Sequence, residues 1–208
     1  MKALLLNGSP NEKKCTYTAL EQVKRGLEDN GVEAQIVWLG QGPLRPCIAC
    51  NGCATTKRCA FGKEDGTNAL LDKASEADAF VVGSPVFYAG INGSLKSALD
   101  RLFFAGGSTF AHKPGGAVVS ARRAGTTTAL DQILKYFLIS EMPVVSSFYW
   151  TMVHGFTPED VLRDEEGVQC AWQLGANMAW LLRSVQAGRE AGVKLPSRSK
   201  RIWTNFIR

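Results

Sequence analysis

The sequence contains no long hydrophobic run, and this absence argues against a membrane-spanning helix. A helix needs about 18 consecutive apolar residues to cross a bilayer, and no stretch approaches that length. The first apolar run covers only residues 3–6, whereas the apolar region of a signal peptide needs roughly 7–15 residues. We therefore expect a cytoplasmic protein without a membrane span.

Motifs for nucleotide triphosphates and for hydrolysis are also missing. Neither G-x-x-x-x-G-K-[ST] nor G-x-G-x-x-G occurs, which disfavours a triphosphate site or a dinucleotide pyrophosphate site. The two histidines, His112 and His154, are far apart, and neither has a serine or carboxylate partner at the spacing of a catalytic triad. We expect neither hydrolase chemistry nor a covalent catalytic nucleophile.

Charge is not concentrated strongly enough to predict nucleic-acid binding. The net charge is +5, and no nucleic-acid-binding module accompanies it. Basic residues without an acidic partner do gather in the last 15 residues: Lys194, Arg198, Lys200, Arg201 and Arg208. We expect a solvated tail. Packing against a neighbouring subunit is the alternative, because the tail also holds Trp203 and Phe206.

The remaining sequence is that of a globular α/β protein. With 208 residues, 45% of them hydrophobic, the chain is long enough for one domain with a full core. We predict one domain over residues 1–193, with a cysteine-rich loop insertion at 41–66, followed by a basic tail at 194–208. The expected strands are 2–7, 32–39, 79–83, 116–120 and 143–149. The expected helices are 18–30, 68–77, 94–104, 126–140, 170–191 and one that begins at 157–160 and is broken by Gly167.

Strands that alternate with helices predict a doubly wound, five-stranded parallel sheet with helices on both faces. Ligands of such sheets bind at the carboxyl ends of the strands, near the point where the strand order switches. We therefore expect the chemistry to lie in the loops that follow the first, third and fourth strands.

The loop after the first strand, Gly8-Ser9-Pro10 to Cys15-Thr16, has hydroxyls and backbone N–H groups at a helix N-terminus. That arrangement suits a phosphate, because the helix dipole favours an anion there. An ordinary turn with a Ser or Thr cap is the alternative. The segment 83–96 after the third strand combines aromatic residues with glycines and suits a flat heterocycle, although it could also be a glycine-rich loop with two core aromatics.

The helix that follows this segment contains Lys96, Asp100 and Arg101, and we expect these charges to face solvent. The loop after the fourth strand holds Arg122 and Arg123. Paired arginines could meet a flavin carbonyl or a cofactor phosphate, or they could be rim charges without a ligand.

Four cysteines form a compact C-x2-C-x2-C-x5-C run: Cys47, Cys50, Cys53 and Cys59. Disulfides are rare in the cytoplasm, so thiols this close together indicate metal binding or redox chemistry. In a domain that also holds a flavin, they would place two redox centres close together. Cys170 falls on the predicted C-terminal helix, and we expect it in the core.

These loops resemble the flavodoxin-like NADPH-dependent FMN reductase family over roughly residues 1–155. The resemblance is carried by GSP-x5-T after the first strand, GSPVFYAGINGSLKSALDR after the third and SARRAG after the fourth. It implies that the first loop binds the phosphate of FMN and that the other two wrap the isoalloxazine ring. Many relatives have Asn just before the Thr of the first loop, where this chain has Cys15.

Carried over residue by residue, the resemblance implies three groups of FMN contacts. The phosphate group is Ser9, Pro10, Cys15 and Thr16; the ring group is Pro85, Val86, Phe87, Tyr88 and Gly90; the far edge of the ring has Ala121, Arg122 and Gly125.

The cysteine run resembles that of the iron–sulfur flavoproteins, a branch of the same family. A [4Fe–4S] cluster needs four thiolates, and short spacings let one loop wrap it. Zinc prefers paired C-x2-C units with a longer spacer. Free or reversibly oxidised thiols remain a third interpretation, since many relatives keep only two or three of these cysteines. Lys57 and Arg58 stand beside Cys59 and are expected to offset the charge of a cluster.

We therefore expect an FMN-dependent oxidoreductase that takes electrons from NAD(P)H or a reduced carrier. The acceptor would be a quinone, a metal ion, oxygen or a redox-partner protein, reached with or without a [4Fe–4S] cluster. A non-enzymatic, flavodoxin-like electron carrier and a metal-stabilised interaction module are the alternatives. Because relatives pair across the flavin, the resemblance also implies a homodimer or homotetramer.

Overall fold

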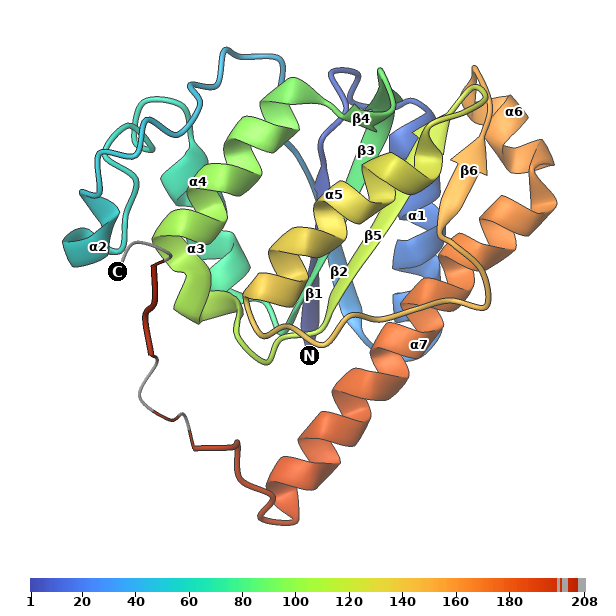
Figure 1. Ribbon diagram of the computed structural model, residues 1–208. Helices are drawn as coiled ribbons and strands as arrows, with labels where there is room; N and C mark the ends of the chain where they lie inside the picture. Colours follow the sequence, from blue (N-terminus) through green and yellow to red (C-terminus); the bar gives the residue numbers. More distant parts are fainter. Residues whose placement is uncertain (198, 200–201, 206–208) are drawn as a thin grey trace.

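A sheet of buried strands lies between two layers of helices in the computed structural model (Figure 1). The structure describes residues 1–197, 199 and 202–205. The strands of this part are β1 (Lys2–Asn7), β2 (Glu33–Trp38), β3 (Ala79–Phe87), β4 (Gly90–Ile91), β5 (Gly115–Ala121) and β6 (Met152–His154). β1, β3 and β5 are almost continuously buried, as expected for parallel strands covered on both faces.

The sheet order is β2-β1-β3-β5-β6, and all of these neighbours are parallel. β4 is the exception: it forms a short antiparallel hairpin with β3. The order reverses between β1 and β3, which is the switch point of a flavodoxin-like fold. The predicted doubly wound, five-stranded parallel sheet is therefore confirmed, with one additional hairpin strand.

Helices cover both faces of the sheet. They are α1 (Cys15–Glu28), α2 (Cys53–Thr56), α3 (Thr67–Glu76), α4 (Gly93–Phe110), α5 (Thr126–Ile139), α6 (Pro158–Arg163) and α7 (Glu165–Glu190). α3, α4 and α5 pack against one face, where Leu4 and Leu6 of β1 point. α1, α6 and α7 pack against the other face, where Leu5 points, because successive side chains of a strand point to opposite faces.

Glycines allow α1 and α7 to approach closely. A Cβ at Gly26 of α1 would lie 2.0 Å from the carbonyl oxygen of Trp172, and a Cβ at Gly175 of α7 would lie 2.1 Å from that of Val23. Since real Cβ atoms do not approach backbone this closely, both positions require glycine. The close contact fixes α1, and with it the loop at its N-terminus.

The structure corrects two predicted elements. Residues 143–149 do not form the fifth strand: they contribute one isolated bridge, between Val144 and Gly115, and the sheet ends with β6 instead. Pro143 has no N–H to donate to a ladder. Gly167 does not break a helix. It lies in the first turn of α7, where its N–H donates to the side chain of Asp164, the N-cap of that helix.

Only part of the predicted basic tail, residues 194–208, lies among the described residues. Lys194 is exposed, and so is Trp203. The other basic residues named for the tail, and Phe206, lie outside the described residues. None of the helices in the described part combines the length and apolarity that crossing a bilayer requires.

Candidate functional site: three strand-end loops and a cysteine pocket

The loop after β1 is held in shape by its own hydrogen bonds. The N–H of Ser9 donates to Asn7 Oδ1 (3.1 Å), and the N–H of Asn11 donates to Ser9 Oγ (3.1 Å). Trp38 at the end of β2 donates from Nε1 to the carbonyl of Ser9 (2.8 Å). This loop is therefore fixed before any ligand binds, with the Ser9 hydroxyl hydrogen still available as a donor.

Helix α1 begins directly after this loop and has an uncapped N-terminus. Its N-cap, Lys14, makes no side-chain capping hydrogen bond, and the first N–H groups of a helix have no partner within the helix. Lys13 and Lys14 are both exposed nearby. Backbone donors, a helix dipole and two cations thus favour an anion at the same point.

The hairpin of β3 and β4 presents an aromatic surface to solvent. Tyr88 and Ala89 form its turn, and both adopt positive φ (48° and 58°), as a two-residue hairpin turn with its right-handed twist requires. The Tyr88 side chain is fully exposed, and Phe87 is half exposed. Left-handed backbone is uncommon for residues with side chains and is often found at ligand sites.

The loop after β5 closes against the hairpin at Gly125. This residue has a φ of +93°, and a Cβ added there would lie 2.8 Å from the Cα of Ala89. Ala121 is buried at the end of β5, whereas Arg122 and Arg123 are exposed. The glycine therefore sets how closely the second and third loops approach.

Hydrogen bonds join the three loops at one edge of the sheet. The N–H of Gly8 donates to the carbonyl of Gly83 (2.9 Å) and so ties the first loop to β3. The buried hydroxyls of Thr16 and Ser120 share a hydrogen bond (2.8 Å) that ties α1 to β5. The structure thus brings the three sequence-predicted segments together, as their strand-end positions indicated.

Cys15 directs its thiol away from the loop, toward the end of β6. Its Sγ donates to the carbonyl of Gly155 (3.7 Å). Burial is the main cause of a raised pKa of this thiol, so Cys15 is neutral at pH 7. The Cys15 side chain therefore packs as a neutral group, and its backbone N–H remains available to a ligand.

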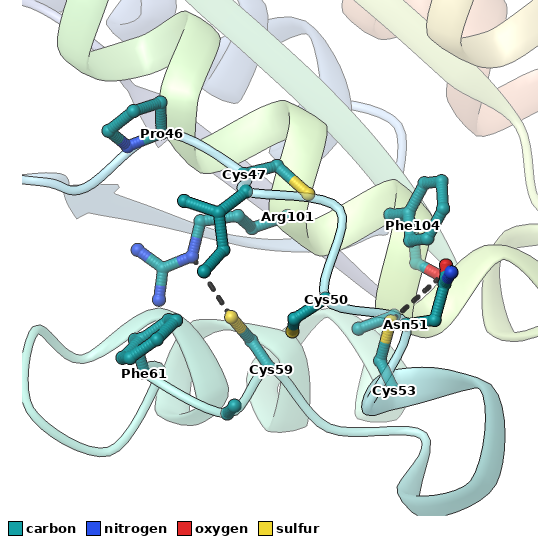
Figure 2. Close-up of a pocket in the computed structure, with 12 residues that line it drawn as sticks. Pro46, Cys47, Cys50, Asn51, Cys53, Cys59, Phe61, Arg101 and Phe104 are labelled. Atoms are coloured by element: carbon teal, nitrogen blue, oxygen red, sulfur yellow. Dashed lines mark hydrogen bonds between the residues drawn. The ribbon is translucent and has the colours of Figure 1, made fainter.

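The four cysteines of the run meet in one pocket, between the 41–66 segment and α4 (Figure 2). The segment is irregular apart from α2. Cys47, Cys50, Cys53 and Cys59 line a small cavity of about 20 Å³, room for about one water molecule. The remaining lining is mostly apolar: Pro46, Ile48, Asn51, Ala60, Phe61, Arg101, Phe104 and Ala105.

The chain turns sharply on both sides of Cys50. Ala49 and Asn51 both have positive φ (53° and 57°). Such backbone costs about 1–3 kcal/mol per residue and persists where the surroundings or a function require it. The two turns allow three thiols of a short run to line the same pocket.

Cys59 and Cys53 are bound to the helices behind the pocket. The side chain of Asn68 in α3 exchanges two hydrogen bonds with the backbone of Cys59, each 3.0 Å. The thiol of Cys53 donates to the carbonyl of Phe104 in α4 (3.8 Å). Burial raises the pKa of Cys53, and the neighbouring cysteines raise it further. Cys47 and Cys50 are exposed.

Arg101 of α4 is buried, which corrects the expectation that it faces solvent. It is 2% exposed. Its Nε donates to Cys59 Sγ (3.1 Å), and its other nitrogens form an ion pair with both oxygens of Asp65 (Figure 2 shows the contact with Cys59). Burial raises the pKa of Asp65, but hydrogen bonds from Arg101 and Thr67 outweigh it, so the net pKa is lowered and the pair is charged.

The two cations that the sequence placed beside Cys59 make other contacts. Lys57 Nζ donates to the carbonyl of Ala54 (2.7 Å). Arg58 forms an exposed ion pair with Asp72 (2.7 Å). Arg101, rather than Lys57 or Arg58, is the cation that contacts Cys59. The sequence contains one sign that Arg101 is buried. Ala98, Arg101 and Ala105 recur at i, i+3 and i+7, which places the arginine on an apolar helix face.

The cysteine pocket is not adjacent to the strand-end loops within one chain. α4 connects the two sites: its N-cap, Asn92, follows the hairpin, and Phe104 lines the cysteine pocket. Twelve residues of helix span about 18 Å. The two sites therefore lie at different points along α4, and the expectation that two redox centres lie close together stays a prediction.

Comparison with known proteins identifies a family and several relatives. The model of the NADPH-dependent FMN reductase family matches residues 1–157. An iron-sulfur flavoprotein of Methanocaldococcus jannaschii is 31% identical over 194 residues, covering 89% of this chain and all of the relative. Another, of Archaeoglobus fulgidus, is 30% identical over 171 residues, covering 80% of this chain and 83% of the relative.

Solved structures agree with the fold. An NAD(P)H:quinone oxidoreductase from Methanothermobacter marburgensis superposes with a TM-score of 0.63 at 16% identity, covering 86% of this chain and 96% of that one.

Proposed function

The chain belongs to the NADPH-dependent FMN reductase family, and from this premise we propose that it passes electrons from NAD(P)H, through FMN and a [4Fe–4S] cluster, to an external acceptor. It is a flavin oxidoreductase, and FMN with NADPH are the cofactor and reductant of the family. The observation that carries the further proposal is the pocket in which all four cysteines of the run meet, backed by a buried arginine.

The strand-end loops fit a monophosphorylated flavin. Ser9 and Pro10, with the N–H groups of Cys15 and Thr16, would hold the phosphate, because the first turn of α1 has no capping side chain. The Thr16 hydroxyl would also donate to the phosphate while it accepts from Ser120. Cys15 would contribute only backbone, since its thiol is engaged with Gly155. A cysteine can therefore stand at this position, where many relatives have asparagine.

The two remaining loops fit a flat ring. One group would form its apolar contact face: Pro85, Val86, Phe87, Tyr88 and Gly90. The other would border its far edge: Ala121, Arg122 and Gly125. Exposed aromatics on a strained hairpin offer the stacking surface, and Gly125 lets the loop after β5 approach the hairpin closely.

Bound FMN supplies the chemistry, since it accepts hydride from a nicotinamide and can release electrons singly. The protein positions the ring and the nicotinamide and excludes competing reactions. No side chain is proposed to act as a covalent nucleophile. Arg122 and Arg123, both exposed beside the hairpin, would attract the anionic nicotinamide cofactor.

The donor set of the cysteine pocket favours an iron–sulfur cluster over zinc. Among the residues described, no three His, Cys, Asp or Glu side chains lie close enough to hold a single metal ion. Both groups take four thiolates, but a four-iron cluster spaces them farther apart than a tetrahedral zinc does. Since the cavity has room for about one water, the exposed part of the loop, with Cys47 and Cys50, would move outward to hold the cluster.

A second copy of the chain would cover the aromatic rim of the flavin site. Phe87 and Tyr88 of the hairpin are both exposed. Exposed aromatic side chains at a ligand site are typical of interaction surfaces, and the family resemblance implied pairing across the flavin. We therefore include a homodimer or homotetramer in the proposal. Sedimentation that finds only a species near the chain mass of 22.6 kDa would count against it.

Turnover decides between the enzyme and a simple carrier. The purified, FMN-loaded protein should oxidise NADPH or NADH in the presence of an artificial acceptor, at a rate proportional to enzyme concentration. Protein that binds FMN but turns over neither nucleotide would behave as an electron carrier. Protein that shows no flavin absorbance near ~450 nm and does not bind added FMN would contradict the whole assignment, because the flavin carries the chemistry.

A further inference from the structure

Arg101 is a buried cation that the flavin chemistry does not use. It lies in the middle of α4, is 2% exposed, and faces the cysteine pocket. Removing a guanidinium from water costs several kcal/mol unless its hydrogen bonds are all satisfied. A chain that needed only to pack α4 against the 41–66 segment would place an apolar side chain here, so the arginine requires a reason.

The guanidinium holds three parts of the segment at once. Nη1 and Nη2 both bond Asp65, and Nη1 also reaches the carbonyl of Arg45 (3.3 Å). Nε is directed at the sulfur of Cys59 (3.1 Å). A planar fork with fixed donors can make all these contacts from one position, which a lysine cannot.

Three other described cations near the pocket are engaged elsewhere. Arg58 and Lys57 are exposed and engaged elsewhere. Arg45 is exposed and stands over the ring of Phe61, 5.2 Å from its centroid. Charges in water are screened, whereas a buried charge acts on its neighbours with little screening. Within the described chain, Arg101 is therefore the cation that dominates the electrostatics of the pocket.

We propose that Arg101 is a positioning residue of the cysteine site, which fixes Cys59 in the metal-free protein and raises the reduction potential of the bound cluster. The proposal rests on the proposed function, because it assigns a cluster to the four thiols. Reduction by one electron adds one negative charge and neither makes nor breaks a bond; the electron comes from NADPH through the flavin. A fixed positive charge at the sulfur of Cys59 stabilises the added charge.

Asp65 has the opposite effect in this account. Its carboxylate orients Arg101 but offsets part of the positive charge. Loss of the cation and loss of the anion should therefore shift the potential in opposite directions. A residue that only supported the fold would not produce shifts of opposite sign, so this pair separates tuning from packing.

The main test is the cluster midpoint potential of the reconstituted full-length protein, followed by EPR during a redox titration. Arg101→Gln should lower the potential enough to change the oxidised-to-reduced ratio at least tenfold, equivalent to about 59 mV for a one-electron couple. Asp65→Asn should raise it. The double variant, in which both charges are removed, should lie between the two and near the wild type. Arg58→Gln, which removes an exposed cation, is the matched control and should leave the potential unchanged.

The positioning half of the proposal is tested without iron. In the metal-free protein, Arg101→Gln should be cleaved by chymotrypsin within 41–66 at least tenfold faster than the Arg58→Gln control, and Arg101→Lys should fall between them. None of these substitutions changes Leu44 or Phe61, the chymotrypsin sites of the segment. Circular dichroism of each variant establishes that the sheet and helices are intact. Equal cleavage rates in the glutamine variants would overturn the positioning role.

The outcomes also separate this inference from the proposed function. Wild-type protein that holds no iron after reconstitution would contradict the cluster, while the protease experiment would still test the positioning role of Arg101. If the wild-type protein holds a cluster, two results would overturn the tuning role alone. One is an Arg101→Gln potential equal to that of the wild type. The other is a shift in the same direction in Arg101→Gln and Asp65→Asn.

Discussion

The flavin loops and the cysteine segment are built in different ways. The flavin loops are the direct continuations of β1, β3 and β5, and backbone hydrogen bonds and a buried hydroxyl pair hold them together. The cysteine segment is an irregular stretch with a four-residue helix, tied to α3 and α4 through side chains. The main ties are Asn68 and Arg101, which both bind Cys59.

The two sites are therefore held in their conformations by different parts of the molecule. The sheet fixes the flavin loops, so they are shaped before the cofactor arrives. The cysteine segment is anchored at Cys59 and Cys53 but exposed at Cys47 and Cys50, so its final geometry depends on what it binds. The two sites should therefore respond separately to mutation, and four changes test this separation.

Cys50→Ser should have the largest effect, and only on one site. Cys50 is exposed, so the substitution costs little stability, but a [4Fe–4S] cluster needs four thiolates. We expect loss of most of the bound iron with FMN affinity unchanged. Iron and sulfide analysis beside a fluorescence titration of FMN measures both. Cys170→Ala, which alters a buried cysteine outside the segment, should retain the iron. A simultaneous loss of FMN binding in Cys50→Ser would show that the sites are not independent.

Gly125→Val should affect the flavin site and leave the cysteine site unchanged. A side chain at a φ of +93° costs about 1–3 kcal/mol, and its Cβ would collide with Ala89. Because about 1.4 kcal/mol corresponds to a tenfold change in affinity, we expect FMN binding to weaken roughly 10- to 100-fold, with iron content preserved. Gly42→Val is the control, since a Cβ there meets open space. Unchanged FMN affinity in Gly125→Val would remove the third loop from the flavin site.

Thr16→Val should have a smaller effect on FMN. It breaks the buried hydroxyl pair with Ser120 and also changes the residue proposed to meet the phosphate. An unsatisfied buried hydroxyl costs about 1–3 kcal/mol, so we expect the Thr16→Val and Ser120→Ala variants to unfold at similarly lower urea concentrations. Thr16→Val should bind FMN roughly tenfold more weakly than Ser120→Ala does, because it also loses one hydrogen bond to the charged phosphate. Equal affinities would mean that Thr16 only supports the loop.

Asp65→Asn tests the anchor of the cysteine segment through pH. The folded-state pKa of Asp65 is lowered, so its stabilising contribution is present above its unfolded value of about 3.9 and is lost as the pH falls through the lower, folded value. In the metal-free protein the variant should lose about 1–3 kcal/mol of unfolding free energy at pH 7. The difference from wild type should shrink below pH 4. Urea unfolding at pH 7 and pH 3 measures this, and a difference that grows in acid would contradict the assigned ion pair.

Patterns along the chain predicted most of the flavin site. Continuous apolar runs located β1 and β3, and the strand-end rule located the loops after them. Residues 143–149 were misassigned because their β-forming side chains outweighed Pro143, whereas the true edge strand, β6, is only three residues long. Such a short strand is determined by its register with β5 rather than by its own composition.

The support of the cysteine site could not be predicted as easily. The spacing of the four cysteines indicated a common site, and the structure brings them to one pocket. Arg101, which contacts Cys59, lies 42 positions farther along the chain. It forms a pair with Asp65 across a tertiary contact, which local sequence patterns do not encode. Only the small residues on either side of Arg101 on its helix face pointed to burial.

The most direct test of two separate redox sites is a count of iron, sulfide and flavin in anaerobically purified protein. The account predicts about one FMN, four iron and four sulfide per chain, the content of one flavin and one [4Fe–4S] cluster. Zinc in place of iron, or one FMN per chain with neither iron nor sulfide after anaerobic reconstitution, would contradict it.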